Sequence, residues 1–92
     1  MLDLNNKTAI VSGGSKGIGK AIAMKLAQAG ANVVICSRKK ANLDSAVNEA
    51  ESNGLTLIPI ECNTSNKESI QSVVDHTIEK FDRVDILSLI HI

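Results

Sequence analysis

Three glycines near the start of the sequence have the spacing to hold a phosphate group. They follow the apolar run Thr8-Ala9-Ile10-Val11, which is typical of a buried strand, and they lead into a segment with helical periodicity. The first backbone N–H groups of a helix are unpaired, and the helix dipole favours an anion beside them. A dinucleotide site is therefore predicted here in preference to a purely structural turn. Its predicted contact residues are Gly13, Ser15, Lys16, Gly17, Ile18 and Gly19.

Strands and helices must alternate around this turn to position it, and the sequence shows that alternation. Strands are predicted over residues 7–12, 32–36 and 56–61 and from about residue 84, and helices over about 17–29, 41–52 and 65–81. The apolar runs are continuous, as in strands covered on both faces of a parallel sheet. Pro59 cannot donate a ladder hydrogen bond and places its strand at an edge. With right-handed crossovers, the predicted fold class is α/β: the N-terminal half of a Rossmann doubly wound parallel sheet, with strand order 3-2-1-4.

Helical periodicity also predicts which helix faces pack on the sheet. In the first helix this face is predicted to hold Ile18, Ile22, Leu26 and Ala29. The last helix is predicted to start with a capping box in which Ser65 is the cap and Glu68 its partner. Its apolar stripe is predicted to comprise Ile70, Val73, Val74, Thr77, Ile78 and Phe81.

The glycine spacing, G-x-x-x-G-x-G with Ser12 in front, resembles the T-G-x-x-x-G-x-G signature of the short-chain dehydrogenase/reductase family. The resemblance covers about residues 3–87 and includes the segment 81–87, which is similar to the family's F-G-x-[VI]-D-I-L. It implies a partial NAD(P)-binding domain over residues 1–87 and hydride transfer between a nicotinamide and a small carbonyl or secondary alcohol. NADP-dependent carbonyl reductases and bacterial 3-oxoacyl-carrier-protein reductases are resembled equally well. The resemblance also implies a homo-oligomer.

The segment Ser37-Arg38-Lys39-Lys40 follows the second strand, where NAD-dependent family members carry an acid for the ribose 2′-hydroxyl. A carboxylate would repel a 2′-phosphate, whereas the Ser37 hydroxyl and Arg38 guanidinium would bind it. Lys16 could reach the same phosphate. The sequence therefore favours NADP(H) over NAD(H). A solvated basic helix start is the alternative, and it suits Lys39 and Lys40 best.

The segment Cys62-Asn63-Thr64 stands where the family commonly carries Asp-Val, whose aspartate meets the adenine amino group. The Asn63 amide oxygen can accept the same hydrogen bond, so the resemblance implies that Asn63 and Thr64 bind the cofactor. A simple turn before the last helix is the alternative. A non-catalytic dinucleotide sensor would share all these features, whereas a Rossmann-like methyltransferase would carry an acid after the second strand.

No catalytic residue is assigned, because the family's catalytic Ser and Tyr-x-x-x-Lys would lie beyond Ile92 and tyrosine does not occur in this sequence. The family's Val-Asn-Asn-Ala-Gly would follow Leu87, but the sequence continues Ser88-Leu89-Ile90-His91-Ile92. The codons CTG TCT CTT ATA CAC ATC would encode residues 87–92 and match a transposase recognition end used in DNA sequencing. We therefore expect residues 88–92 to be a non-native tail. Resequencing that finds native codons followed by a stop would contradict this.

Composition argues against several kinds of partner. Ten basic and ten acidic residues cancel, and Phe81 is the single aromatic residue, so nucleic acid is not an expected partner. The N-terminal segment does not resemble a signal peptide, and no apolar run is long enough to cross a membrane, so a cytoplasmic protein without a membrane partner is expected. Cys36 and Cys62 are expected to be buried reduced thiols, without a metal.

Overall fold

The computed structural model describes residues 3–13, 17–63 and 66–88, with the side chain of Ser88 excepted. Its elements occur in the predicted order, and their ends agree with the prediction to within about two residues. They are β1 (Thr8–Ser12), α1 (Gly17–Gln28), β2 (Asn32–Ser37), α2 (Lys40–Ser52), β3 (Leu57–Glu61), α3 (Lys67–Phe81) and β4 (Ile86–Ser88). Residues 89–92 lie outside the described part, so the proposed non-native origin of residues 88–92 stays a prediction.

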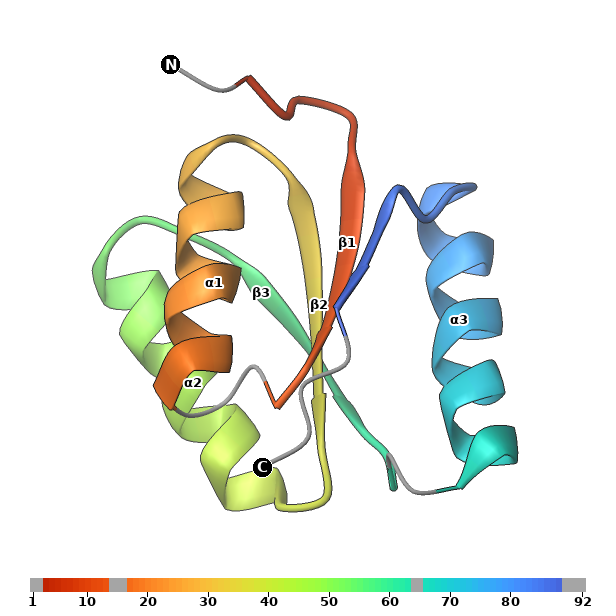
Figure 1. Ribbon diagram of the computed structural model, residues 1–92. Helices are drawn as coiled ribbons and strands as arrows, with labels where there is room; N and C mark the ends of the chain where they lie inside the picture. Colours follow the sequence, from red (N-terminus) through yellow and green to blue (C-terminus); the bar gives the residue numbers. More distant parts are fainter. Residues whose placement is uncertain (1–2, 14–16, 64–65, 89–92) are drawn as a thin grey trace.

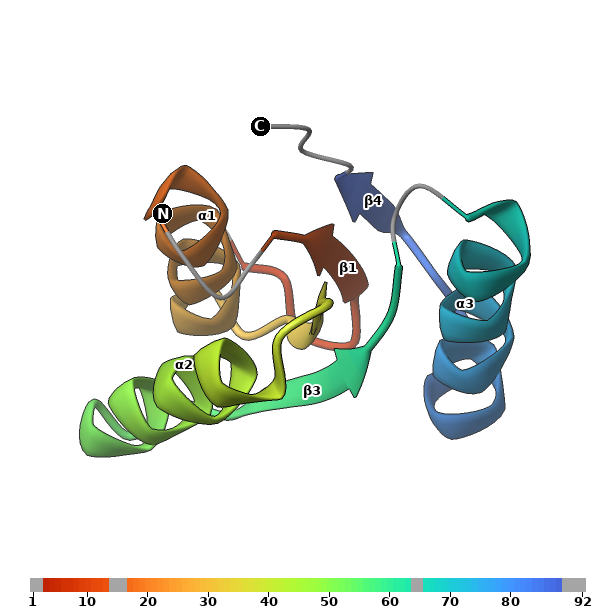
Figure 2. The same ribbon diagram turned by 90° about the horizontal axis from the view of Figure 1, so that it is seen from below.

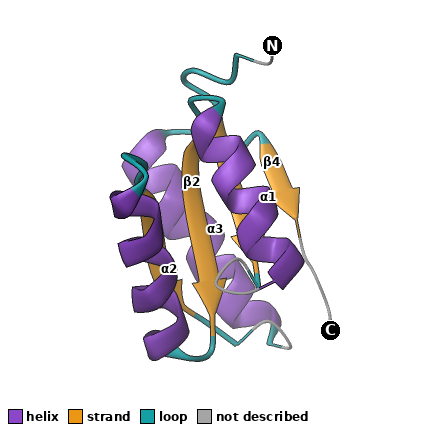
Figure 3. Cartoon of the chain, turned by 90° about the vertical axis from the view of Figure 1, so that its left-hand side faces the viewer, coloured by secondary structure: helices purple, strands orange, loops and turns teal. Residues whose placement is uncertain are grey.

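The four strands form one parallel sheet in the order β3-β2-β1-β4, which confirms the predicted topology. Helices α1 and α2 cover one face and α3 covers the other (Figures 1 and 2). Figure 3 shows α1 and α2 side by side over the sheet, where Lys20 Nζ lies 3.1 Å from Glu49 Oε2. None of the described helices is long and apolar enough to span a membrane.

Each face of the sheet has its own layer of buried side chains, because successive strand residues point to opposite faces. Under α1 and α2 these are Val11, Ala23, Ala31, Val33, Ile35, Leu43, Ala46, Ala50 and Leu57. Under α3 they are Ile10, Val34, Cys36, Cys62 and Val73. Covering on both faces explains why β1 and β2 are continuously apolar in sequence.

One carboxylate, that of Asp85, joins the amino ends of β1 and β4. Its Oδ2 accepts a hydrogen bond from Thr8 N at 2.8 Å, and Asp85 N donates to Thr8 O at 2.8 Å. Arg83 Nη2 donates to Asp85 Oδ1 at 2.6 Å. The hydrogen bond from Arg83, and next that from Thr8, lowers the pKa of Asp85. These contacts hold β4 in the register that pairs Ala9 with Ile86.

Three helix predictions are wrong in detail. Ile18 is 70% exposed and Ile78 is 44% exposed, so neither packs on the sheet. The α1 residues that are buried are Gly19 and Ala23, because the helix lies close to the strands and only small side chains fit beneath it. The cap of α3 is Asn66, not Ser65: Asn66 Oδ1 accepts from Glu68 N at 2.8 Å and from Ser69 N at 3.3 Å.

Candidate dinucleotide site

The parallel sheet brings three predicted binding segments to one edge, at the carboxyl ends of β1, β2 and β3 (lower end of Figure 1). Gly13 N donates to Cys36 O at 3.0 Å, which ties the glycine turn to the end of β2. Cys62 N donates to Ser37 O at 2.9 Å and extends the ladder between β2 and β3 beyond the last strand residue. In open parallel sheets, this edge is where ligands bind.

The glycine turn has the backbone geometry that its composition predicts. Gly13 and Gly17 have φ values of 69° and 54°, in the left-handed region that glycine adopts most easily. Gly17 is the first residue of α1, and a Cβ added to it would meet no atom of the described residues within 4 Å. Gly19 is buried, whereas the side chain of Ile18 is 70% exposed. Ser15 and Lys16 lie outside the described residues.

The segment after β2 is basic and open. Ser37 Oγ accepts a hydrogen bond from Lys39 N at 3.3 Å, which turns the chain from β2 into α2. Arg38 is exposed and forms no ion pair with any described residue. Lys39 is the N-cap of α2 with extended backbone (φ −109°, ψ 109°), and no side chain in the described part caps the helix. The first N–H groups of α2 are therefore open to an anionic ligand.

The segment after β3 is held by hydrogen bonds that its backbone forms with the start of α3. Asn63 N donates to Ser69 Oγ at 2.9 Å, and Asn66 N donates to Asn63 O at 3.0 Å. Asn63 lines an open hollow of about 360 Å³ together with Arg38, Glu61 and Cys62. Thr64 lies outside the described residues. Sequence reasoning missed Glu61, although its place as the last residue of a predicted strand was a usable signal.

The two cysteines lie at the carboxyl ends of β2 and β3, in the buried layer under α3. Cys36 is 3% exposed and Cys62 is 7% exposed, and both are free thiols, as predicted. Burial, followed by a hydrogen bond with Cys62 that favours the protonated thiol, raises the pKa of Cys36 to about 12. Cys36 is therefore a protonated core residue and a poor nucleophile at neutral pH.

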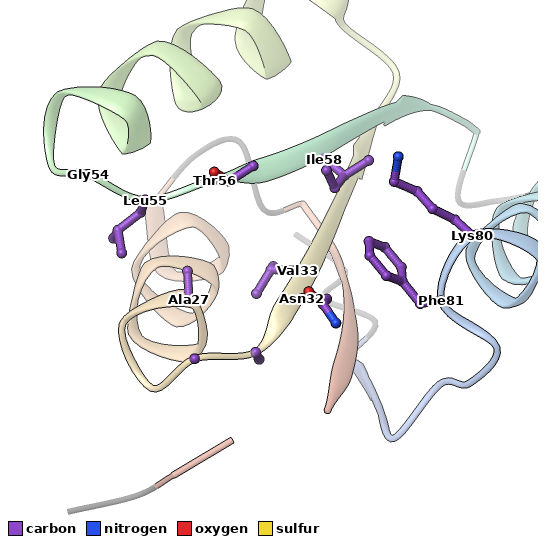
Figure 4. A pocket seen from close by; sticks show the side chains of 11 residues that line it. Ala27, Asn32, Val33, Gly54, Leu55, Thr56, Ile58, Lys80 and Phe81 are labelled. Atoms are coloured by element: carbon purple, nitrogen blue, oxygen red, sulfur yellow. The ribbon is translucent and has the colours of Figure 1, made fainter. Parts of the chain in front are cut away.

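A second hollow of about 320 Å³ lies at the opposite edge of the sheet (Figure 4). It is lined by Ala27, Gly30, Ala31, Asn32, Val33, Gly54, Leu55, Thr56, Ile58, Lys80 and Phe81. These residues come from the amino ends of β2 and β3 and from the last turns of the helices or just beyond them. Helix C-termini carry the negative end of the dipole, so this hollow does not favour a pyrophosphate.

Comparison with known proteins gives a consistent result. The family model for short chain dehydrogenase matches residues 7–89. Tropinone reductase-like 3 of Erythroxylum coca is 38% identical over 88% of this chain and 31% of its own length. Dehydrogenase/reductase SDR family member 4 of Mus musculus is 38% identical over 91% of this chain and 30% of its own length.

A metagenomic short-chain oxidoreductase in complex with NADP superposes with a TM-score of 0.84 at 32% identity, over 91% of this chain and 38% of that one. The chain spans about a third of the length of the curated relatives that it matches. The match to the family model, the glycine turn and the 3-2-1-4 sheet agree with one another. The chain belongs to the short-chain dehydrogenase/reductase family.

Proposed function

We propose that this chain is the cofactor-binding part of an NADP(H)-dependent oxidoreductase that transfers hydride between the nicotinamide and a small carbonyl or secondary alcohol. The bound nicotinamide would supply or accept the hydride. The residues of the site bind and orient the dinucleotide. Gly13, Gly17 and Gly19 contact the pyrophosphate. Ser37 and Arg38 bind the 2′-phosphate, and Asn63 binds the adenine. The family resemblance supports a homo-oligomer.

The start of α2 is the observation that carries the preference for NADP(H). It combines a helix N-terminus that no described side chain caps, a first turn without an acid and the exposed Arg38 beside it. An anion at such a start interacts with free N–H groups and with the positive end of the dipole. A 2′-phosphate supplies that anion, whereas the 2′-hydroxyl of NAD(H) does not. The relative whose structure contains NADP supports the same cofactor class.

The open space over Gly17 supports pyrophosphate binding at the glycine turn. A side chain there would touch no described protein atom, so the space is available to a ligand that approaches the backbone. Gly54, at the end of α2, also has positive φ (74°) and open space around it, but it lies at the opposite edge of the sheet. The two glycines therefore differ in their distance from the proposed ligand and not in local strain.

This difference gives the experiment, which uses the complete protein that contains this chain. Gly17→Ala and Gly54→Ala should each reduce the free energy of unfolding by about 1 kcal/mol through backbone strain. Only Gly17→Ala should also weaken NADP⁺ binding, by roughly tenfold or more, because its methyl group obstructs the pyrophosphate. Calorimetric titration and urea unfolding measure both quantities. Equal NADP⁺ affinity in the two variants would refute the site.

Catalysis is tested separately. The complete reading frame should encode Ser and Tyr-x-x-x-Lys downstream, and the protein should oxidise NADPH in the presence of a ketone or aldehyde. The 92-residue chain should not, because it contains no tyrosine to act as the family's acid/base. Tight dinucleotide binding by a complete protein without these residues would favour a non-catalytic sensor.

A further inference from the structure

Glu61 is the last residue of β3, the strand that lies beside β2 and the proposed 2′-phosphate site. It pairs with Ser37 in the register between β2 and β3, and paired residues of neighbouring strands point to the same face of the sheet. Glu61 also lines two hollows. It shares one of about 360 Å³ with Arg38 and one of about 170 Å³ with Lys40 and Asp44. Glu61 therefore borders both the hollow beside Arg38 and the hollow beside the first turns of α2.

The charge of Glu61 is unusual for its place in the sheet. The other three strands end in Ser12, Ser37 and Ser88, so Glu61 is the one acidic strand end in the described sheet. It is exposed, and no described residue forms an ion pair or hydrogen bond with its carboxylate. An unpaired carboxylate keeps its full charge available to act on a ligand beside it.

We infer that Glu61 is a specificity-determining residue that weakens the binding of NADP(H) relative to NAD(H). This inference rests on the proposed function. Position 37 carries Ser and not the acid that would repel a 2′-phosphate. Glu61, which pairs with Ser37 on the adjacent strand, nevertheless places a negative charge beside this position. Charges a few ångströms apart at a wet surface repel appreciably. NADP(H) is therefore bound less tightly than it would be with Ser37 and Arg38 alone. NAD(H) lacks the 2′-phosphate, so Glu61 does not repel it in this way.

The test compares Glu61→Gln with Glu51→Gln in the complete protein. Both changes remove one negative charge with little change of shape, and both residues are exposed, but Glu51 lies in the last turn of α2, far from the site. Calorimetric titrations with NADP⁺ and with NAD⁺ at low salt measure the two affinities. Glu61→Gln should tighten NADP⁺ binding about three- to tenfold and change NAD⁺ binding less than about twofold. Glu51→Gln should change neither.

The gain in Glu61→Gln should also shrink as salt is added, because mobile ions screen exposed charges. An unchanged NADP⁺ affinity, or an equal shift for both dinucleotides, overturns the inference. Arg38→Ala, titrated in parallel, separates this failure from that of the proposed function. If Arg38→Ala leaves NADP⁺ binding unchanged, the proposed 2′-phosphate site is wrong. If Arg38→Ala weakens NADP⁺ binding and Glu61→Gln does not tighten it, only the role of Glu61 is wrong.

Discussion

Helices α2 and α3 both begin at the carboxyl ends of the strands, where the ligand is proposed to bind, but their first turns are built in opposite ways. The start of α3 is satisfied from within, because Asn66 Oδ1 accepts two backbone hydrogen bonds and Glu68 provides a negative charge in the first turn. The start of α2 has no described side-chain cap and no acid, and Arg38 and Lys39 precede it. Both cap positions have the extended backbone of an N-cap, so the difference lies in the side chains.

Under the proposed function, this difference separates a helix start that stabilises the fold from a helix start that binds the ligand. A helix start that carries its own cap gains stability and has no need of an external anion. A helix start without one gives up that stability and keeps its N–H groups and dipole for a ligand. The sequence around α2 is consistent with a site kept open for a phosphate, and that around α3 with a purely structural start.

Reversing the charge beside α2 should have the largest effect. Arg38→Asp should weaken NADP⁺ binding about a hundredfold, because a charge-assisted hydrogen bond is lost and a repulsive charge is added. NAD⁺ binding should be largely retained. The free energy of unfolding should change by less than about 0.5 kcal/mol, because Arg38 is exposed and forms no ion pair with a described residue. Lys25→Asp is the control, since it makes the same charge change in the last turn of α1. An Arg38→Asp variant that binds NADP⁺ as tightly as the wild type would contradict the assignment of Arg38.

Removing the cap of α3 should affect stability alone. Asn66→Ala leaves the N–H groups of Glu68 and Ser69 without their acceptor and should lower the free energy of unfolding by about 1 kcal/mol. NADP⁺ affinity should stay within about twofold of the wild type. Urea unfolding and calorimetric titration give the two values. A large loss of NADP⁺ binding would mean that the start of α3 also serves the ligand.

Adding a cap to α2 should reduce the difference between the two helices. Lys39→Asn places a preferred cap residue on a backbone that already has the right conformation, so it should raise the free energy of unfolding by about 0.5 kcal/mol. The new cap should compete with the 2′-phosphate for the same N–H groups and, together with the lost lysine charge, weaken NADP⁺ binding about two- to fivefold. Lys39→Gln, which removes the charge without a short capping side chain, is the control. Equal NADP⁺ affinities in the two variants would show that these N–H groups do not contact the ligand.

Local patterns in the sequence predicted the elements that surround the site well. The glycine spacing predicted a turn between a strand and a helix, and Gly13 and Gly17, at its two ends, have the positive φ values that glycine adopts most easily. Helix faces were less predictable, because an apolar stripe identifies one side of a helix but not the distance at which the helix packs. The close approach of α1 buries Gly19 and Ala23 and leaves Ile18 in solvent. The cap of α3 was misplaced by one residue, because Ser65 and Asn66 are both good caps and the chain path into the helix selects between them.

The sequence by itself determined the order of strands and helices and the position of β3 at an edge of the sheet, because periodicity and the missing N–H of Pro59 are local properties. Only the tertiary structure decided which side chains lie together at the carboxyl ends of the strands. Ser37 and Glu61 are separated along the chain by the whole of α2, and the strand register, set by packing on both faces of the sheet, brings them together. The site therefore depends on non-local contacts that no single segment of the sequence encodes.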